Sequence, residues 1–119
     1  MIFDEVVQKA VEETNGGIAA VIMASDGISI THYVKPEKNI DLETLGIEYA
    51  NLLAEIAKHT EAMEAGSVKE VCLKTDNFLS VIRVLTSEYF IALILQKDGN
   101  LGKGRFILRV NAPALLKEL

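Results

Sequence analysis

The sequence has 119 residues, of which 50% are hydrophobic and 24% are charged, as in an ordinary globular domain. With 17 acidic and 12 basic residues the net charge is -5, which repels phosphate backbones and disfavours a general nucleic-acid binder. A single cysteine, Cys72, excludes an intrachain disulfide. The chain opens without the pattern of a secretion signal, and its apolar runs are too short to span a bilayer. We therefore expect one cytoplasmic domain over residues 1–119.

Apolar residues at spacings of three and four predict an amphipathic helix at the start of the chain, ended by Asn15-Gly16-Gly17. The following stretch, Ile18 to Ala24, is apolar throughout, as in a strand that is covered on both faces. From Ile28 to Val34 apolar residues alternate with polar ones, and Asp26-Gly27 has the composition of a hairpin turn. We expect the first strand to be central and the second to lie near an edge.

The middle of the chain predicts a long helix that begins after Asp41, a suitable N-cap, and ends near Ala65. Three strands with short connections are expected at Val68–Lys74, Phe78–Leu85 and Tyr89–Leu95. The last of these strands is again apolar throughout, so it belongs in the centre beside the first. The prediction is a five-stranded antiparallel sheet in the spatial order 2-1-5-4-3.

A final apolar helix follows the turn at 97–100 and contains Pro113, at which we expect a kink or a fresh start near Asn111. The order of elements is therefore αββαβββα, an α/β (α+β) fold with helices on both faces of the sheet.

The middle helix carries two apolar stripes, although a helix that lies on a sheet needs only one. The stripe of large side chains is expected to cover the sheet, and it consists of Leu42, Leu45, Tyr49, Leu52, Leu53, Ile56 and Met63. The second stripe has small side chains that allow another helix to approach closely, and it consists of Gly46, Ile47, Ala50, Ala54 and Ala57. We interpret the second stripe as the interface of a two-fold homodimer. The alternative is that loops or the tail around Pro113 cover it.

Two stretches in this order of elements, Gly17–Ile28 in the first hairpin and Asn100-Leu101-Gly102 at the last helix, resemble the roadblock/dynein light chain family and its bacterial MglB-type members. The resemblance covers nearly the whole chain. It implies a profilin-like or longin-like sandwich, a dimer built on the second helix and a neighbouring edge strand, and binding to small Ras-like GTPases. It implies no shared catalytic residues. Pro113 departs from the uninterrupted last helix that is usual in the family.

Candidates for chemistry are few. The stretch Gly99–Gly104 has glycines and a lysine before a helix, but it lacks the spacing of a phosphate-binding loop and the Ser or Thr after the lysine. His32, His59 and Cys72 come from three separate elements, without metal-ligand spacing. We therefore expect no enzyme activity, no cofactor and no metal, and we take Cys72 as a small buried hydrophobe.

These observations predict a homodimeric regulator or adaptor that binds a small Ras-like GTPase and modulates its GTP hydrolysis or its localisation. The candidate contact residues lie on the polar side of the middle helix and are Glu48, Asn51, Glu55, Lys58 and His59. One alternative is a scaffold subunit of a motor, signalling or membrane-associated complex without effect on nucleotide turnover, and another is a small-ligand sensor. An arginine finger from Arg83, Arg105 or Arg109 is a further idea.

One basic cluster is formed by Lys97, Lys103, Arg105 and Arg109 in and before the last helix. It either meets an acidic partner or is simply solvated, and solvation is the simpler interpretation.

Overall fold

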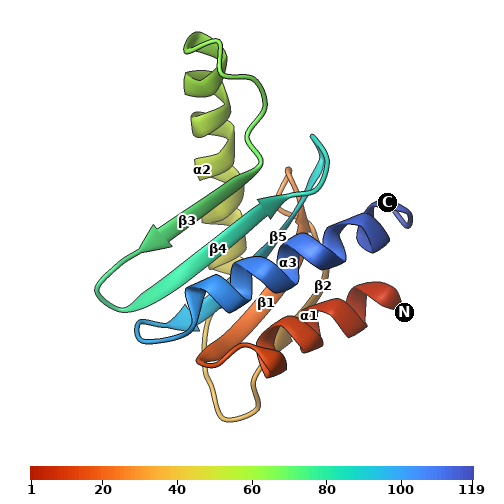
Figure 1. Ribbon diagram of the computed structural model, residues 1–119, viewed down its shortest axis with the longest axis vertical. Helices are drawn as coiled ribbons and strands as arrows, with labels where there is room; N and C mark the ends of the chain where they lie inside the picture. Colours follow the sequence, from red (N-terminus) through yellow and green to blue (C-terminus); the bar gives the residue numbers. More distant parts are fainter.

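The computed structural model describes residues 1–119 and has the predicted order αββαβββα (Figure 1). The elements are α1 (Ile2–Glu13), β1 (Gly17–Ala24), β2 (Ser29–Val34), α2 (Leu42–Ala62), β3 (Glu70–Lys74), β4 (Phe78–Val84), β5 (Tyr89–Gln96) and α3 (Leu101–Leu116).

The five strands form one antiparallel sheet in the order β2-β1-β5-β4-β3, which confirms the predicted order and the profilin-like arrangement. The two strands predicted to be central, β1 and β5, pair with each other in the middle of the sheet, and six of the eight residues in each are buried. They are apolar over most of their length because helices lie on both faces of the sheet. The alternating strand β2 is an edge strand, as expected.

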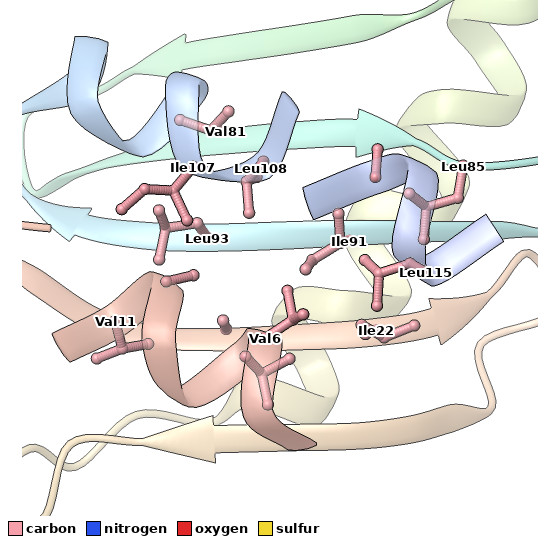
Figure 2. Packing of buried hydrophobic residues seen from close by; sticks show 14 of the residues in the cluster. Val6, Val11, Ile22, Val81, Leu85, Ile91, Leu93, Ile107, Leu108 and Leu115 are labelled. Atoms are coloured by element: carbon pink, nitrogen blue, oxygen red, sulfur yellow. The ribbon is translucent and has the colours of Figure 1, made fainter. Parts of the chain in front are cut away.

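One face of the sheet is covered by α1 and α3, which lie side by side (Figure 1). Seventeen buried residues form the core between these helices and the sheet. Figure 2 shows that Val6 of α1 and Leu108 and Leu115 of α3 point toward Ile22 and Leu93 of the central strands. These apolar contacts place the outer sides of α1 and α3 in solvent.

The opposite face carries α2 alone, over a smaller core of ten buried residues. The hydroxyl of Tyr49 lies 2.5 Å from Oγ of Ser80 on β4. The buried residues of α2 all belong to its first half, and they are Leu42, Gly46, Tyr49 and Ala50. Figure 1 shows the second half of α2 extending past the end of the sheet. The second half of the longest helix is thus only partly covered by its own chain.

Some predicted boundaries and one predicted break differ from the structure. The strand expected from Val68 begins at Glu70, and α2 ends at Ala62, three residues before the expected end. The helix α3 continues through Pro113 to Leu116, so a fresh start near Asn111 is wrong. Proline removes the hydrogen bond to the carbonyl group of Arg109, and the helix continues without it.

Candidate functional site

The start of α2 is fixed by its N-cap, Asp41. Its carboxylate accepts hydrogen bonds from the Thr44 backbone N–H (3.1 Å) and the Thr44 hydroxyl (2.7 Å). Because both bonds favour the charged carboxylate, they hold the pKa of Asp41 below its usual value. The capped first turn then places the rest of α2 in a defined direction along the sheet.

The five residues predicted to form the dimer interface fall into two groups. Gly46 and Ala50 are buried within the chain itself, and a Cβ atom on Gly46 would lie 2.8 Å from Sδ of Met23 on β1. These two small residues allow α2 to approach the sheet, so their surface is already covered within the protomer. Ile47, Ala54 and Ala57 are exposed, and Ile47 retains 40% of its accessible surface. Only three of the five predicted interface residues are thus exposed.

The predicted sheet-covering stripe is also divided. Leu42 and Tyr49 are buried, whereas Met63 is 68% exposed. The residues between them are half-buried, and they are Leu45, Leu52, Leu53 and Ile56. Because α2 leaves the sheet after its first half, large apolar side chains in its second half lack full cover. The structure thus has the excess apolar surface on α2 that the sequence predicts, and this surface lies mostly toward the end of the helix.

Two open hollows flank α2. The larger, of about 800 Å³, is lined by Leu53, Ala54 and Ala57 of α2, by Val68 before β3 and by Phe90 of β5, among others. The smaller, of about 570 Å³, lies on the β2 side, and His32, Val34 and Glu43 are among its lining residues. The larger hollow adjoins the exposed alanines, so it belongs to the same incompletely covered surface.

The five candidate contact residues for a partner are all exposed on α2. They are Glu48, Asn51, Glu55, Lys58 and His59. Nζ of Lys58 lies 3.3 Å from the carboxylate of Glu55, so Glu55 pairs with Lys58. Both side chains of this pair are largely exposed, and such a pair contributes little to stability. These residues therefore form a solvated polar strip that remains available for contact.

The edge strand β3 is tied to α3 by an ion pair. Glu70 accepts hydrogen bonds from Nε of Arg105 (2.8 Å), with Nη2 of the same arginine also at 2.8 Å, and Nη1 of Arg83 lies 3.7 Å away. The hydrogen bond and the charge of Glu70 raise the pKa of Arg105. Because Arg83 and Arg105 both face Glu70, neither is free in this structure to reach into another protein as an arginine finger.

The other polar candidates do not assemble into a reactive site. Cys72 is exposed on β3, which corrects the expectation that it is buried. Partial burial and the nearby charge of Glu70 raise the pKa of Cys72, which keeps the thiol protonated. His32 and His59 lie on separate elements, and the structure contains no group of three or more side chains that could hold a metal ion. None of the three helices has the length and apolar character needed to cross a membrane.

The glycine-rich stretch before α3 serves turning and packing. Oδ1 of Asn100 accepts a hydrogen bond from the Lys103 backbone N–H (3.0 Å) and caps the helix. Gly104 is buried, and a Cβ atom there would lie 3.0 Å from Cδ2 of Leu93. Gly104 thus brings α3 close to β5, and the N-terminal N–H groups of the helix are partly used by its own cap.

The sheet order, the single helix on one face and the paired helices on the other define a roadblock-type α/β protein. The solved structure of MglC from Myxococcus xanthus is 38% identical to this chain over 100% of both chains, with a TM-score of 0.72. The gliding protein MglB from Thermus thermophilus is 17% identical, with a TM-score of 0.85 over 95% of this chain and 84% of its own. A Roadblock/LC7 domain from Streptomyces avermitilis is 14% identical, with a TM-score of 0.77 over 95% of this chain and 97% of its own.

The chain belongs to the roadblock/LC7 family, with MglC and MglB among its relatives. No family model and no curated protein matches it.

Proposed function

We propose that residues 1–119 form a single cytoplasmic roadblock-like domain that homodimerises through α2. We further propose that the dimer binds a small Ras-like GTPase as a regulator or adaptor and modulates its GTP hydrolysis or its localisation. The observation that carries the proposal is the incompletely covered apolar surface on the second half of α2. Membership in the family of MglB and MglC supports the general kind of function, a GTPase-pathway regulator.

The dimer is supported by the composition of the exposed surface of α2. Ala54 and Ala57 are exposed one turn apart, next to the half-buried Leu53, which lines the same hollow. Small residues beside larger ones permit close packing of two helices, and a two-fold axis would bring the same surface of both copies together. A second copy of α2 would therefore cover both the alanines and the neighbouring Leu53. It would also occupy the larger hollow beside α2.

The polar strip on α2 supports contact with a further protein at the rim of this dimer. Charged residues at the rim of an interface steer association and set specificity more than they add affinity. The dimer would change the GTPase by binding one conformation of its switch loops more tightly than another, because a ligand shifts an equilibrium only through such a difference. We propose no arginine finger from Arg83 or Arg105, since both face Glu70.

Light scattering tests the dimer. We expect the wild-type protein to have twice the protomer mass at micromolar concentration, and the double variant Ala54→Glu, Ala57→Glu to have the protomer mass. The glutamates would be buried without partners in the interface. Ala114→Glu, on the exposed side of α3, is the matched control and should remain dimeric. A wild-type monomer, or a dimer that survives the double variant, would contradict dimerisation through α2.

The proposed binding and regulation of a GTPase are tested by GTP turnover. The turnover of the Ras-like GTPase of the same organism is measured with and without this protein. We expect binding of the GTPase to be weakened by Glu48→Lys together with Glu55→Lys, and the turnover rate to change when the wild-type dimer is added. Binding with an unchanged rate and an unchanged location of the GTPase in cells would favour the scaffold alternative. An absence of binding would overturn the GTPase proposal while leaving the dimer intact.

A further inference from the structure

The outer side of α3 exposes two apolar side chains one turn apart. Phe106 is 48% exposed and Val110 is 46% exposed, at the i and i+4 positions of the helix. The inward side of the same helix is filled by Ile107, Leu108 and Leu115, which face the sheet (Figure 2). The apolar character of Phe106 and Val110 is therefore not needed for the core, and the two side chains form a small apolar patch in solvent.

Two basic side chains flank this patch. Nζ of Lys103 lies 5.8 Å from the centre of the Phe106 ring, and Cζ of Arg109 lies 5.4 Å from it. Cations within about 6 Å of an aromatic ring are attracted by its face. The three ion pairs of the structure are Lys58–Glu55, Arg83–Glu70 and Arg105–Glu70, so neither Lys103 nor Arg109 has an acidic partner.

The charge of α3 is opposite to that of the chain. The helix has three basic residues and no acidic one, although the net charge of the chain is -5. Of the three, only Arg105 is neutralised, by Glu70. The apolar patch and its two unpaired cations therefore form a distinct positive surface, which we call the α3 patch: Lys103, Phe106, Arg109 and Val110.

The α3 patch lies on the face of the sheet that is opposite to α2 (Figure 1). A protein bound to α2, whether a second copy or another partner, leaves this face accessible. The patch is thus independent of the proposed dimer and GTPase contacts.

We propose that the α3 patch docks an acidic amphipathic helix from a partner protein. Apolar side chains of such a helix would pack on Phe106 and Val110, whose spacing matches one helical turn. Its carboxylates would pair with Lys103 and Arg109, which are already held beside the ring. Occupation of α2 and α3 by different proteins would make this chain a bridge between them, which goes beyond the function proposed above.

Charge favours an acidic helix over an anionic membrane or a nucleic acid as the ligand of the α3 patch. A membrane surface with anionic lipids would be repelled by the overall charge of -5. Nucleic acid is disfavoured for the same reason, because its affinity grows with the number of phosphates that are neutralised. A short acidic helix needs only the local charge of α3.

The test uses two designed helical peptides of equal length, with leucines one turn apart and either glutamates or lysines at the flanking positions. Binding to the wild-type protein is followed through its backbone amide NMR shifts. We expect the glutamate peptide to bind and to move the signals of the α3 patch, and the lysine peptide not to bind. Phosphatidylserine vesicles and a DNA duplex are compared under the same conditions.

The double variant Lys103→Glu, Arg109→Glu should weaken binding of the glutamate peptide at least about tenfold, equivalent to about 1.4 kcal/mol. The milder pair Lys103→Gln, Arg109→Gln should weaken it less and guards against misfolding, which thermal unfolding checks. Lys9→Glu with Lys38→Glu changes the net charge equally elsewhere and should leave binding unchanged. The proposal is overturned if the glutamate peptide does not bind, if its signals map to α2, if the variants bind it equally well, or if vesicles or DNA bind in its place.

Discussion

The hydroxyl group of Tyr49 on α2 forms a hydrogen bond of 2.5 Å with the hydroxyl group of Ser80 on β4. Both residues are buried, with 4% and 1% of their surface exposed. Burial raises the pKa of Tyr49, so the group stays protonated and can donate or accept in this pair. The bond joins the only helix on its face of the sheet to a strand that this helix crosses.

Replacing Tyr49 by phenylalanine should lower the free energy of unfolding by about 1–3 kcal/mol, because Ser80 is left buried without a partner. Ser80→Ala should have a similar effect, since it leaves the tyrosine hydroxyl unpaired. The double variant should be more stable than the sum of the two losses implies, because both polar groups are then gone. Chemical denaturation of the four proteins measures the coupling, and strictly additive losses would mean that the two hydroxyls do not interact.

Gly46→Ala should destabilise the protomer. Alanine adds about 1 kcal/mol of helix propensity, but the new methyl group would overlap the buried Met23, and such overpacking costs about 1–3 kcal/mol. We expect a net loss of about 1 kcal/mol, measured by denaturation of the monomeric Ala54→Glu, Ala57→Glu protein. Adding Met23→Val should restore stability by shortening the opposing side chain. A weaker dimer with unchanged protomer stability would return Gly46 to the interface.

Thr14 ends α1, and its side-chain oxygen is buried without a hydrogen-bond partner, at 2% exposure of the residue. Thr14→Val replaces this hydroxyl by a methyl group of similar shape, and the extended backbone of the residue suits a branched side chain. We expect the free energy of unfolding to rise by about 1 kcal/mol, because an unpaired polar group no longer has to leave water. Thr14→Ser, which keeps the hydroxyl and loses the methyl group, should be less stable than the wild type.

The cap of α2 predicts a dependence of stability on pH. The folded-state pKa of Asp41 is lowered by its hydrogen bonds to Thr44, so its contribution is complete above the unfolded value of about 3.9 and is lost as the pH falls through the folded value. Asp41→Ala should therefore lower the melting temperature at neutral pH and differ less from the wild type below about pH 4.

Asp41→Asn is the matched control for the charge, because it keeps an acceptor oxygen but does not titrate. Its melting temperature should lie between those of the wild type and the alanine variant at neutral pH. A difference between wild type and alanine variant that stays constant across the acid range would show that the charge of Asp41 does not contribute.

Most of the sheet could be predicted because burial on two faces leaves a direct trace in the sequence. The uninterrupted apolar strands β1 and β5 and the alternating β2 determine the strand order, and short turns determine antiparallel pairing. The fresh start expected near Asn111 was wrong, because sequence alone does not tell whether a helix continues through a proline.

The candidate surface on α2 could be predicted only in part. Helical periodicity identifies a second apolar stripe, but it does not tell at which residue the helix leaves the sheet. Small residues have two uses that look the same in a sequence, and Gly46 and Ala50 serve close approach to β1 whereas Ala54 and Ala57 remain exposed. The sequence shows Lys103, Arg105 and Arg109 as one basic cluster. It does not show that Arg105 is neutralised, because its partner Glu70 lies 35 positions away.

Because α2 extends past the sheet, fraying of its outer turns should depend on whether another protein is bound there. Its outer turns are held mainly by their own backbone hydrogen bonds, so their amide hydrogens should exchange with deuterium through local fraying while the turns around Tyr49 remain protected. Any protein that packs against those turns would slow the exchange. Deuterium uptake between Leu53 and Ala62 is therefore a direct gauge, in dilute solution or in a cell extract, of how much of this protein is engaged at that helix.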